Sequence, residues 1–197
     1  MQRLYRARRT PEFIEVPELR FLMVDGHGDP NRSERYQQAV QALYAVSYAL
    51  KFALKKQFGL DWRVGPLEGL WWATDMAAFS VRRKGDWDWT MMIRQAAAVT
   101  PQLLEQAVRQ LAEKKPLPVA RELQLERFRE GPAAQVLHLG PYGTEGPTIN
   151  ALHAFIRAQG RRSDGRRHQH HEIYLGDPRR TAPERLRTIT RQPVNPT

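Results

Sequence analysis

Two glutamates lie in short apolar and aromatic segments that the residue pattern predicts to be strands. Glu68 lies in Pro66–Trp72, and Glu172 lies in His170–Tyr174. Burying a carboxylate among aromatic side chains costs free energy unless the group is paired or has a function. Two such carboxyls in one cleft could supply a general base for water and a partly protonated acid. Exposure at a strand end, or pairing with a nearby arginine, explains the two residues equally well from spacing alone.

The two glutamates hold the same position in what looks like a duplicated unit. Phe21–Gly28 leads into a helical segment and then into the strand with Glu68. Ala134–Gly143 leads in the same way into a helical segment and then into the strand with Glu172. A duplication relates equivalent positions by an internal pseudo-twofold axis. We therefore expect the two glutamates to approach each other in a central cleft where the halves meet.

The faces of these strands extend the candidate site. Side chains alternate between the two faces of a strand, so Tyr174 accompanies Glu172 and Trp72 accompanies Glu68. A hydroxyl from Tyr174 or Tyr44 could donate a hydrogen bond to a substrate. Several of the aromatic candidates suit the hydrophobic core equally well. The side chains expected to bind substrate are Trp71, Trp72, Trp87, Trp89, Tyr44, Tyr48, Tyr142 and His170.

The histidines beside the second glutamate match a metal site only in part. His168 and His170 would share a strand face, which suits two imidazoles on one ion, but Glu172 is the sole third ligand nearby. The sequence has no cysteine, which excludes a thiolate nucleophile and a cysteine-type zinc site. We therefore expect neither a metal nor a cofactor.

Composition restricts the class of protein. The 197 residues suffice for a hydrophobic core, and we expect one domain over 1–197 with halves at about 12–115 and 119–190. No apolar run nears the ~20 residues that span a bilayer, and the N-terminus lacks a signal peptide, so we expect a cytoplasmic protein. The net charge of +10 comes without a nucleic-acid-binding motif. It predicts weak, salt-dependent attraction to polyanions and no specific nucleic-acid recognition.

Hydrophobic periodicity and turn residues predict an α+β fold with antiparallel strands. One helix should begin at the cap Asn31, bury a stripe that includes Tyr36, Leu43 and Leu50, and end before Gly59. Two further helices are expected from Thr100 to about 114 and over 147–159. The expected strands are 12–16, 19–25, 67–73, 76–82, 87–93, 122–129, 134–139 and a last strand at 170–175, followed by a short closing helix over about 181–190.

Three segments resemble the GyrI-like small-molecule-binding family, and in particular its stand-alone bacterial branch. They are Pro66–Trp72, Leu137–Tyr142 and His170–Arg180, and the resemblance covers residues from about 12 to 190. It implies duplicated β-α-β-β units with pseudo-twofold symmetry and a ligand cleft between them. The same fold serves as the drug-sensing domain of multidrug regulators and, in a SOUL-like form, occurs in haem-binding relatives. A conserved cleft glutamate of the family matches Glu172.

Some members of the stand-alone branch are cyclopropanoid hydrolases, which detoxify DNA-alkylating compounds by opening a cyclopropane with water. For this reaction, the residues offer Glu172 as the group that orients and deprotonates the water and Glu68 as a candidate second carboxyl, although which of the two is the base stays open. Tyr174 or Tyr44 would polarise the carbonyl of the substrate. The planar ring system would stack on Trp72, together with Trp71, Trp87 or Trp89.

Other functions are compatible with the same residues. The main alternative is a binding module that sequesters hydrophobic or cationic aromatic small molecules without catalysis. A third function is binding of a protein partner, such as a DNA-topology enzyme, through the basic surface. Haem binding is the weakest, with His170 as a conceivable axial ligand.

Overall fold

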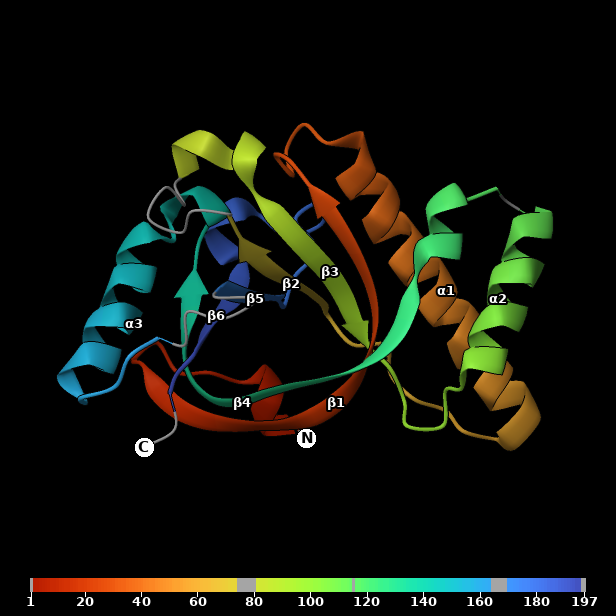
Figure 1. Ribbon diagram of the computed structural model, residues 1–197, viewed down its shortest axis with the longest axis horizontal. Coiled ribbons are helices and arrows are strands. Elements are labelled where there is room, and N and C mark those ends of the chain that lie inside the picture. Colours follow the sequence, from red (N-terminus) through yellow and green to blue (C-terminus); the bar gives the residue numbers. More distant parts are fainter. Residues whose placement is uncertain (1, 74–80, 115, 164–169, 196–197) are drawn as a thin grey trace.

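Antiparallel strands form a closed barrel in the computed structural model, which describes residues 2–73, 81–114, 116–163 and 170–195 (Figure 1). The strand order around the barrel is β1-β3-β2-β5-β6-β4. This arrangement, with three α-helices in the described residues, confirms the mixed α and β class with antiparallel pairing. The strands are β1 (Glu12–His27), β2 (Leu67–Trp72), β3 (Asp88–Arg94), β4 (Gln124–Leu139), β5 (His170–Tyr174) and β6 (Arg187–Pro193).

The helices cover the barrel from two sides. α1 (Glu34–Phe58) and α2 (Pro101–Lys114) lie side by side at one end of the molecule, and α3 (Gly146–Ala158) lies at the other (Figure 1). The positions of all three helices were predicted, including the end of α1 at Gly59, whose φ of 65° suits a glycine. No helix among the described residues has the length and apolar character needed to cross a membrane.

The start of α1 differs from the prediction. Ser33 caps the helix, because its side-chain oxygen accepts a hydrogen bond from the Tyr36 N–H. Asn31 instead turns back toward Asp29, whose Oδ1 accepts hydrogen bonds from the backbone and side-chain nitrogens of Asn31. The expected cap was therefore wrong by two residues, because Asn31 instead forms an Asx turn with Asp29.

Each of the two long strands replaces a predicted pair of short ones. β1 runs through Pro17, and β4 runs through Gly131, although both positions read as turns in the sequence. β1 and β4 pair antiparallel along most of their lengths, with Val16 opposite Gly131, which has a φ of 75°. The proline and the glycine therefore fall at one shared bend, and the ladder continues on both sides of it.

The C-terminal region also differs from the prediction, because β5 is not the last strand. Residues 183–185 form a single 3₁₀ turn, and β6 follows where a helix was expected. β6 closes the barrel by pairing with β5 and β4. The expected strand at 76–82 lies mostly outside the described residues, and Val81–Asp86 forms a 3₁₀ helix.

The barrel wall separates two apolar layers. The outer faces of β2 and β3 pack on α1 and α2 and bury residues such as Trp71, Met91 and Leu50. The inner faces bury a smaller set that includes Leu70 and Met92. A side chain on β2 or β5 therefore faces either the helices or the barrel interior, and this choice decides where each glutamate lies.

Candidate active site

A cleft of about 2280 Å³ lies over the outer face of β2 and β5, between α1 and α3. Its lining comes from both predicted halves of the chain, as expected for a central ligand site. The aromatic side chains that line it are Tyr5, Tyr36, Tyr44, Tyr48, Trp71, Trp87, Tyr142 and Tyr174. Such a cleft suits a flat, largely apolar small molecule.

Glu172 lies in this cleft and is held by its neighbours on the same face of β5. Its Oε1 accepts a hydrogen bond from His170 Nε2 at 2.8 Å, and its Oε2 accepts one from the Tyr174 hydroxyl at 2.6 Å. Burial by itself would raise the pKa of Glu172, but the hydrogen bonds and the charge from His170 outweigh it, and the pKa is lowered. Glu172 is therefore an oriented carboxylate at neutral pH.

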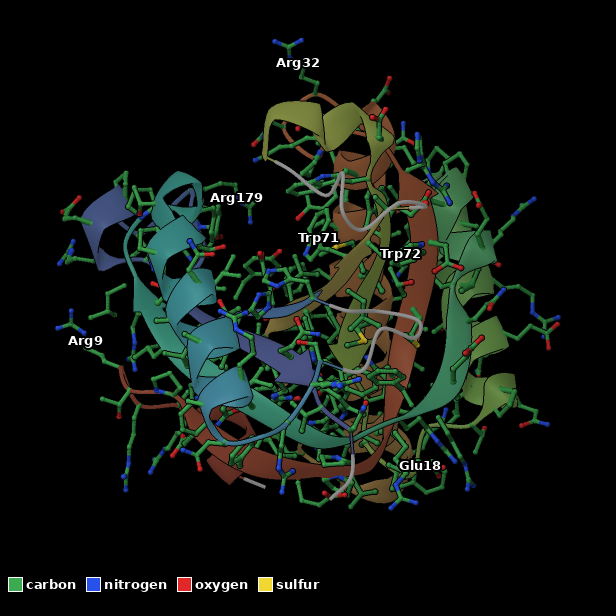
Figure 2. All side chains as sticks on the ribbon, turned by 60° about the vertical axis from the view of Figure 1, so that its left-hand side comes forward. Arg9, Glu18, Arg32, Trp71, Trp72 and Arg179 are labelled. Atoms are coloured by element: carbon green, nitrogen blue, oxygen red, sulfur yellow. The ribbon has the colours of Figure 1, made fainter. Side chains whose placement is uncertain are left out.

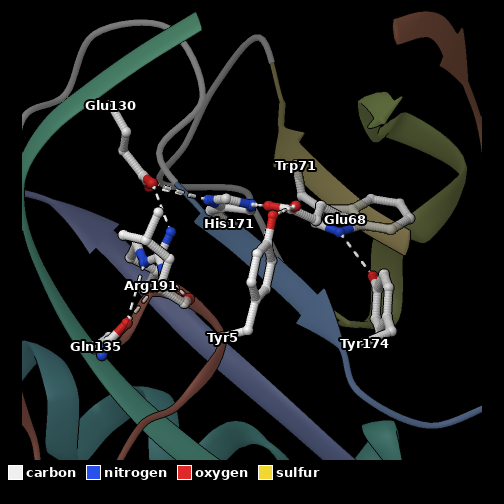
Figure 3. Close-up of polar contacts among 9 residues, drawn as sticks. Tyr5, Glu68, Trp71, Glu130, Gln135, His171, Tyr174 and Arg191 are labelled. Atoms are coloured by element: carbon white, nitrogen blue, oxygen red, sulfur yellow. Dashed lines mark hydrogen bonds and ion pairs between the residues drawn. The ribbon is translucent and has the colours of Figure 1, made fainter. Parts of the chain in front are cut away.

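Tyr174 is positioned from the neighbouring strand. Trp71 Nε1 donates a hydrogen bond to the Tyr174 hydroxyl at 3.1 Å (Figure 3). Tyr142 contacts the Tyr174 ring edge-on with centroids 5.4 Å apart. The indole of Trp71 can fold back along β2 because position 69 is glycine. A Cβ at Gly69 would lie 2.7 Å from Trp71 Nε1. A relay of two hydrogen bonds, from Trp71 to Tyr174 and from Tyr174 to Glu172, therefore ends at the carboxylate.

A second carboxyl, Glu145, lies next to Glu172. It directly precedes α3, is 4% exposed and also lines the cleft. Burial and the negative charge and hydrogen bond of Glu172 raise the pKa of Glu145 to about 10. The pair therefore consists of a neutral acid beside a carboxylate, which is the pattern of a general acid and a general base. The sequence carries no signal for Glu145, since an acidic residue at a helix N-terminus is ordinary.

Glu68 lies on the other side of the barrel wall, so the expectation that it faces Glu172 was wrong. The register places Glu68 opposite Ile173, whereas Glu172 lies opposite Gly69. Paired residues share a face, so the two glutamates point in opposite directions. Glu68 is 1% exposed, accepts a hydrogen bond from the Tyr5 hydroxyl at 2.8 Å, and does not line the cleft (Figure 3).

Glu68 belongs to a buried ionic network inside the barrel (Figure 3). His171 Nε2 lies 3.0 Å from Glu68 Oε2, and His171 Nδ1 lies 3.0 Å from Glu130 Oε1. Burial would lower the pKa of His171, but Glu130 and Glu68 raise it to about 9. Arg191 also contacts Glu130, at 3.1 Å, and donates to the Leu4 carbonyl. Two cations thus balance two carboxylates and hold the N-terminal segment in place.

The other predicted site residues divide between the cleft and the core. Trp72 packs on the inner face of β2 with Leu70, and Trp89 is fully buried; neither lines the cleft. Figure 2 shows Trp71 and Trp72 within the molecule, whereas Arg9 and Arg32 extend from its periphery. The predicted residues that do line the cleft are Trp71, Trp87, Tyr44, Tyr48, Tyr142, His170, Glu172 and Tyr174.

Tyr36 was predicted only as part of the buried stripe of α1, yet it is also a wall of the cleft. Its ring stacks on Trp71 with centroids 6.1 Å apart and meets Trp89 edge-on at 5.4 Å. The cleft wall and the core under α1 are therefore one continuous aromatic cluster.

The histidines do not form a metal site in the described part of the chain. His170 and His171 point to opposite faces of β5, the first toward the cleft and the second toward Glu68. His168 lies outside the described residues. No group of three or more histidine, aspartate or glutamate side chains with a geometry for metal binding occurs in the ranges that the structure describes.

Comparisons with known proteins agree with this architecture. A family model for the GyrI-like small molecule binding domain matches residues 9–194. An uncharacterized conserved protein from Listeria innocua is 42% identical, with a TM-score of 0.92, over 98% of this chain and 96% of that chain. A protein from Listeria innocua described as a hydrolase is 40% identical, with a TM-score of 0.87 and the same coverage.

More distant similarity concerns the fold alone. The C-terminal domain of EcmrR is 10% identical, with a TM-score of 0.59, over 95% of this chain and 98% of that domain. No curated protein sequence matches the chain.

Proposed function

Because the chain belongs to the family of GyrI-like small-molecule-binding domains, we propose that it is a hydrolase that opens the cyclopropane of DNA-alkylating cyclopropanoid compounds with water. The observation that carries the proposal is the oriented carboxylate of Glu172 beside a neutral Glu145 in an aromatic cleft. The description of a 40% identical protein as a hydrolase supports hydrolytic chemistry in general. A cytoplasmic enzyme of this kind would meet the alkylating compound before it reached DNA.

In the proposed reaction, a water oxygen attacks the least substituted carbon of the cyclopropane. The new C–O bond forms as the ring C–C bond breaks, and the electron pair passes through the conjugated ring to the carbonyl oxygen, which becomes a phenolate. Glu172 takes the proton of the attacking water. The phenolate then takes a proton from solvent, and Glu172 releases its proton, so the net change is the addition of water.

Glu145 takes over the role of second carboxyl that was expected for Glu68. Its proton lets it donate a hydrogen bond to Glu172 or to the bound water, whereas a second negative charge at this position would repel the base. The Tyr174 hydroxyl donates its hydrogen bond to Glu172 and therefore acts as a positioning group. Trp71, Trp87 and Tyr36 would stack on the planar ring system and exclude bulk water.

Turnover tests this function. Protein at a small fraction of the concentration of a synthetic cyclopropanoid should convert all of it to the hydrated phenol, measured by chromatography. Glu172→Gln should lower kcat by about 10²–10⁴-fold and leave binding of the compound nearly unchanged. Glu34→Gln is the matched control, since Glu34 is an exposed glutamate that lines the same cleft. Equal turnover by both variants would contradict the proposal.

Sequestration without catalysis is the alternative, and the size and aromatic lining of the cleft favour it as the second function. A sequestering protein would protect DNA only up to one compound per chain, and Glu172→Gln would not alter that protection. Hydrophobic and cationic aromatic compounds would bind on the same walls.

We also infer that the chain arose by duplication of a β-α-β-β unit. The units would be β1-α1-β2-β3 and β4-α3-β5-β6, with α2 as the connection. The barrel order supports this inference, because exchanging β1 with β4, β2 with β5 and β3 with β6 reproduces the same neighbours.

A further inference from the structure

A buried glutamine lines the cleft on the strand next to Glu172. Gln192 lies on β6, is 3% exposed and lines the cleft. Its Oε1 accepts a hydrogen bond from His153 Nε2 at 3.3 Å, while its Nε2 has no hydrogen-bond partner among the described residues. His153 comes from α3, and burial lowers its pKa, so the ring is neutral at pH 7. His153 thus fixes the amide oxygen, while the buried amide nitrogen has no partner among the described residues.

An unpaired buried donor beside the cleft points to a ligand with a hydrogen-bond acceptor. Buried amide groups in folded proteins are almost always hydrogen-bonded, because losing their hydration without a new partner is unfavourable. A hydrogen-bond donor beside a cleft that lacks a protein partner is the kind of group that stabilises a negative charge developing on a bound molecule.

The ladder between β5 and β6 sets the distance between this donor and the base. Glu172 lies opposite Thr190, so Gln192 lies one strand over and two residues further along. With about 3.4 Å per residue and about 4.8 Å between strands, the two backbone positions are about 8 Å apart. The donor and the base can therefore contact opposite ends of one small planar molecule.

The proposed ring opening requires such a separation. Water attacks one end of the conjugated system, and the electron pair arrives at the carbonyl oxygen at the other end. Tyr174 donates to Glu172, and Glu145 lies against Glu172, so both are placed at the end where water reacts. Gln192 is placed to contact the other end of the substrate, where the carbonyl oxygen receives the electron pair.

We propose that Gln192, oriented by His153, donates a hydrogen bond to the carbonyl oxygen of the substrate and stabilises the phenolate that forms there. This assignment rests on the proposed function and narrows the substrate class. The substrate is a vinylogous electrophile, in which a conjugated planar ring separates the reacting carbon from the carbonyl. The amide supplies a hydrogen bond and transfers no proton, so the phenolate is protonated by solvent.

The first test is a variant without the donor. Gln192→Met keeps the length of the side chain and removes the amide. We expect kcat to fall by about 10²-fold, as for the loss of one oxyanion donor, with little change in KM. Gln106→Met is the matched control, because Gln106 is an exposed glutamine on α2 that does not line the cleft, and it should keep the wild-type kcat.

The second test needs no turnover. The pKa of 2-naphthol bound to the protein can be read from its absorbance, and the donor should lower it. Gln192→Met should raise that pKa, Gln192→Glu should raise it further through charge repulsion, and Gln106→Met should leave it unchanged. A general disturbance of the fold would not produce this order. Circular dichroism melting checks each variant, and Gln192→Glu carries the test if Gln192→Met does not fold.

The outcomes separate this inference from the proposed function. If the wild type does not turn over a cyclopropanoid but lowers the pKa of naphthol through Gln192, the donor assignment stands and the hydrolase proposal fails. If the wild type turns over the compound and Gln192→Met matches it in kcat and in naphthol pKa, the donor assignment is overturned.

Discussion

Glu145 and Glu172 lie carboxyl to carboxyl in the cleft, and their surroundings move their pKa values in opposite directions. His170 and Tyr174 hold Glu172 as an anion, while burial and the charge of Glu172 keep Glu145 protonated. Two glutamates from different elements thereby form one unit that carries a single negative charge at neutral pH. This relationship makes the function and the stability of the protein depend on pH in ways that can be measured.

Glu145→Gln should stabilise the protein at neutral and alkaline pH. The pKa of Glu145 is raised from 4.5 in the unfolded chain to about 10 when folded, so its contribution to stability is fully present below 4.5 and is lost as pH rises toward 10. Glutamine stays neutral and avoids this loss. We expect a gain of about 0.5–2 kcal/mol at pH 8 and a smaller one at pH 4.5, measured by urea unfolding. An equal gain at both pH values would contradict the protonated state.

Turnover of a cyclopropanoid should stay constant through neutral pH and fall as pH rises through about 10, where Glu145 loses its proton. The second negative charge would then disturb the base and its water. The measurement is kcat from pH 6 to 11, with circular dichroism to confirm that the protein stays folded. Glu145→Gln cannot ionise and should lack this alkaline limb; a limb that persists in the variant would assign it to another group.

Tyr174→Phe should shift the acidic limb of the rate profile to higher pH. The Tyr174 hydroxyl stabilises the charged form of Glu172, and its removal raises the pKa of that carboxyl. We expect a shift of about one pH unit, which corresponds to about 1.4 kcal/mol. Tyr44→Phe is the control, since Tyr44 also lines the cleft but has no such bond to Glu172 in the described structure. Equal profiles for both variants would count against the positioning role.

Gly69→Ala should impair the site without touching a carboxyl. The new Cβ would lie 2.7 Å from Trp71 Nε1, so the indole must move away from the Tyr174 hydroxyl. We expect a loss of about 1–3 kcal/mol in unfolding free energy together with a lower kcat. Gly143→Ala is the control, because a Cβ there meets no atom within 4 Å. A wild-type kcat in Gly69→Ala would show that the relay from Trp71 is dispensable.

His171→Leu should destabilise the barrel by about 3–5 kcal/mol, because it leaves the buried carboxylates Glu68 and Glu130 short of a partner. The pKa of His171 is raised to about 9, so its contribution is fully present below 6.5 and is lost as pH rises through 9. The difference from wild type in urea unfolding should therefore shrink between pH 7 and 10. His27→Leu, at an exposed pair with Asp88, should cost about 1 kcal/mol or less.

Local patterns predicted the elements that depend on local chemistry. The apolar spacing of α1 and its glycine end, the proline start of α2 at Pro101 and the position of β5 were all expected from the residues themselves. The failures share a cause. Pro17 and Gly131 are typical turn residues, but they lie at the same bend of the long ladder between β1 and β4. Residues 187–190 resembled part of a helix, but they form the start of β6 because β4 and β5 pair with them on both sides.

The sequence by itself indicated that a glutamate in an aromatic strand was a candidate for a cleft, and Glu172 lines the cleft of the structure. Only the tertiary structure decided which carboxyl accompanies it. Side chains alternate along a strand, so the register between β2 and β5 turned Glu68 into the barrel and left Gly69 opposite Glu172. The place beside the base was then filled by Glu145 from the start of α3, a contact between elements that no spacing within one segment encodes.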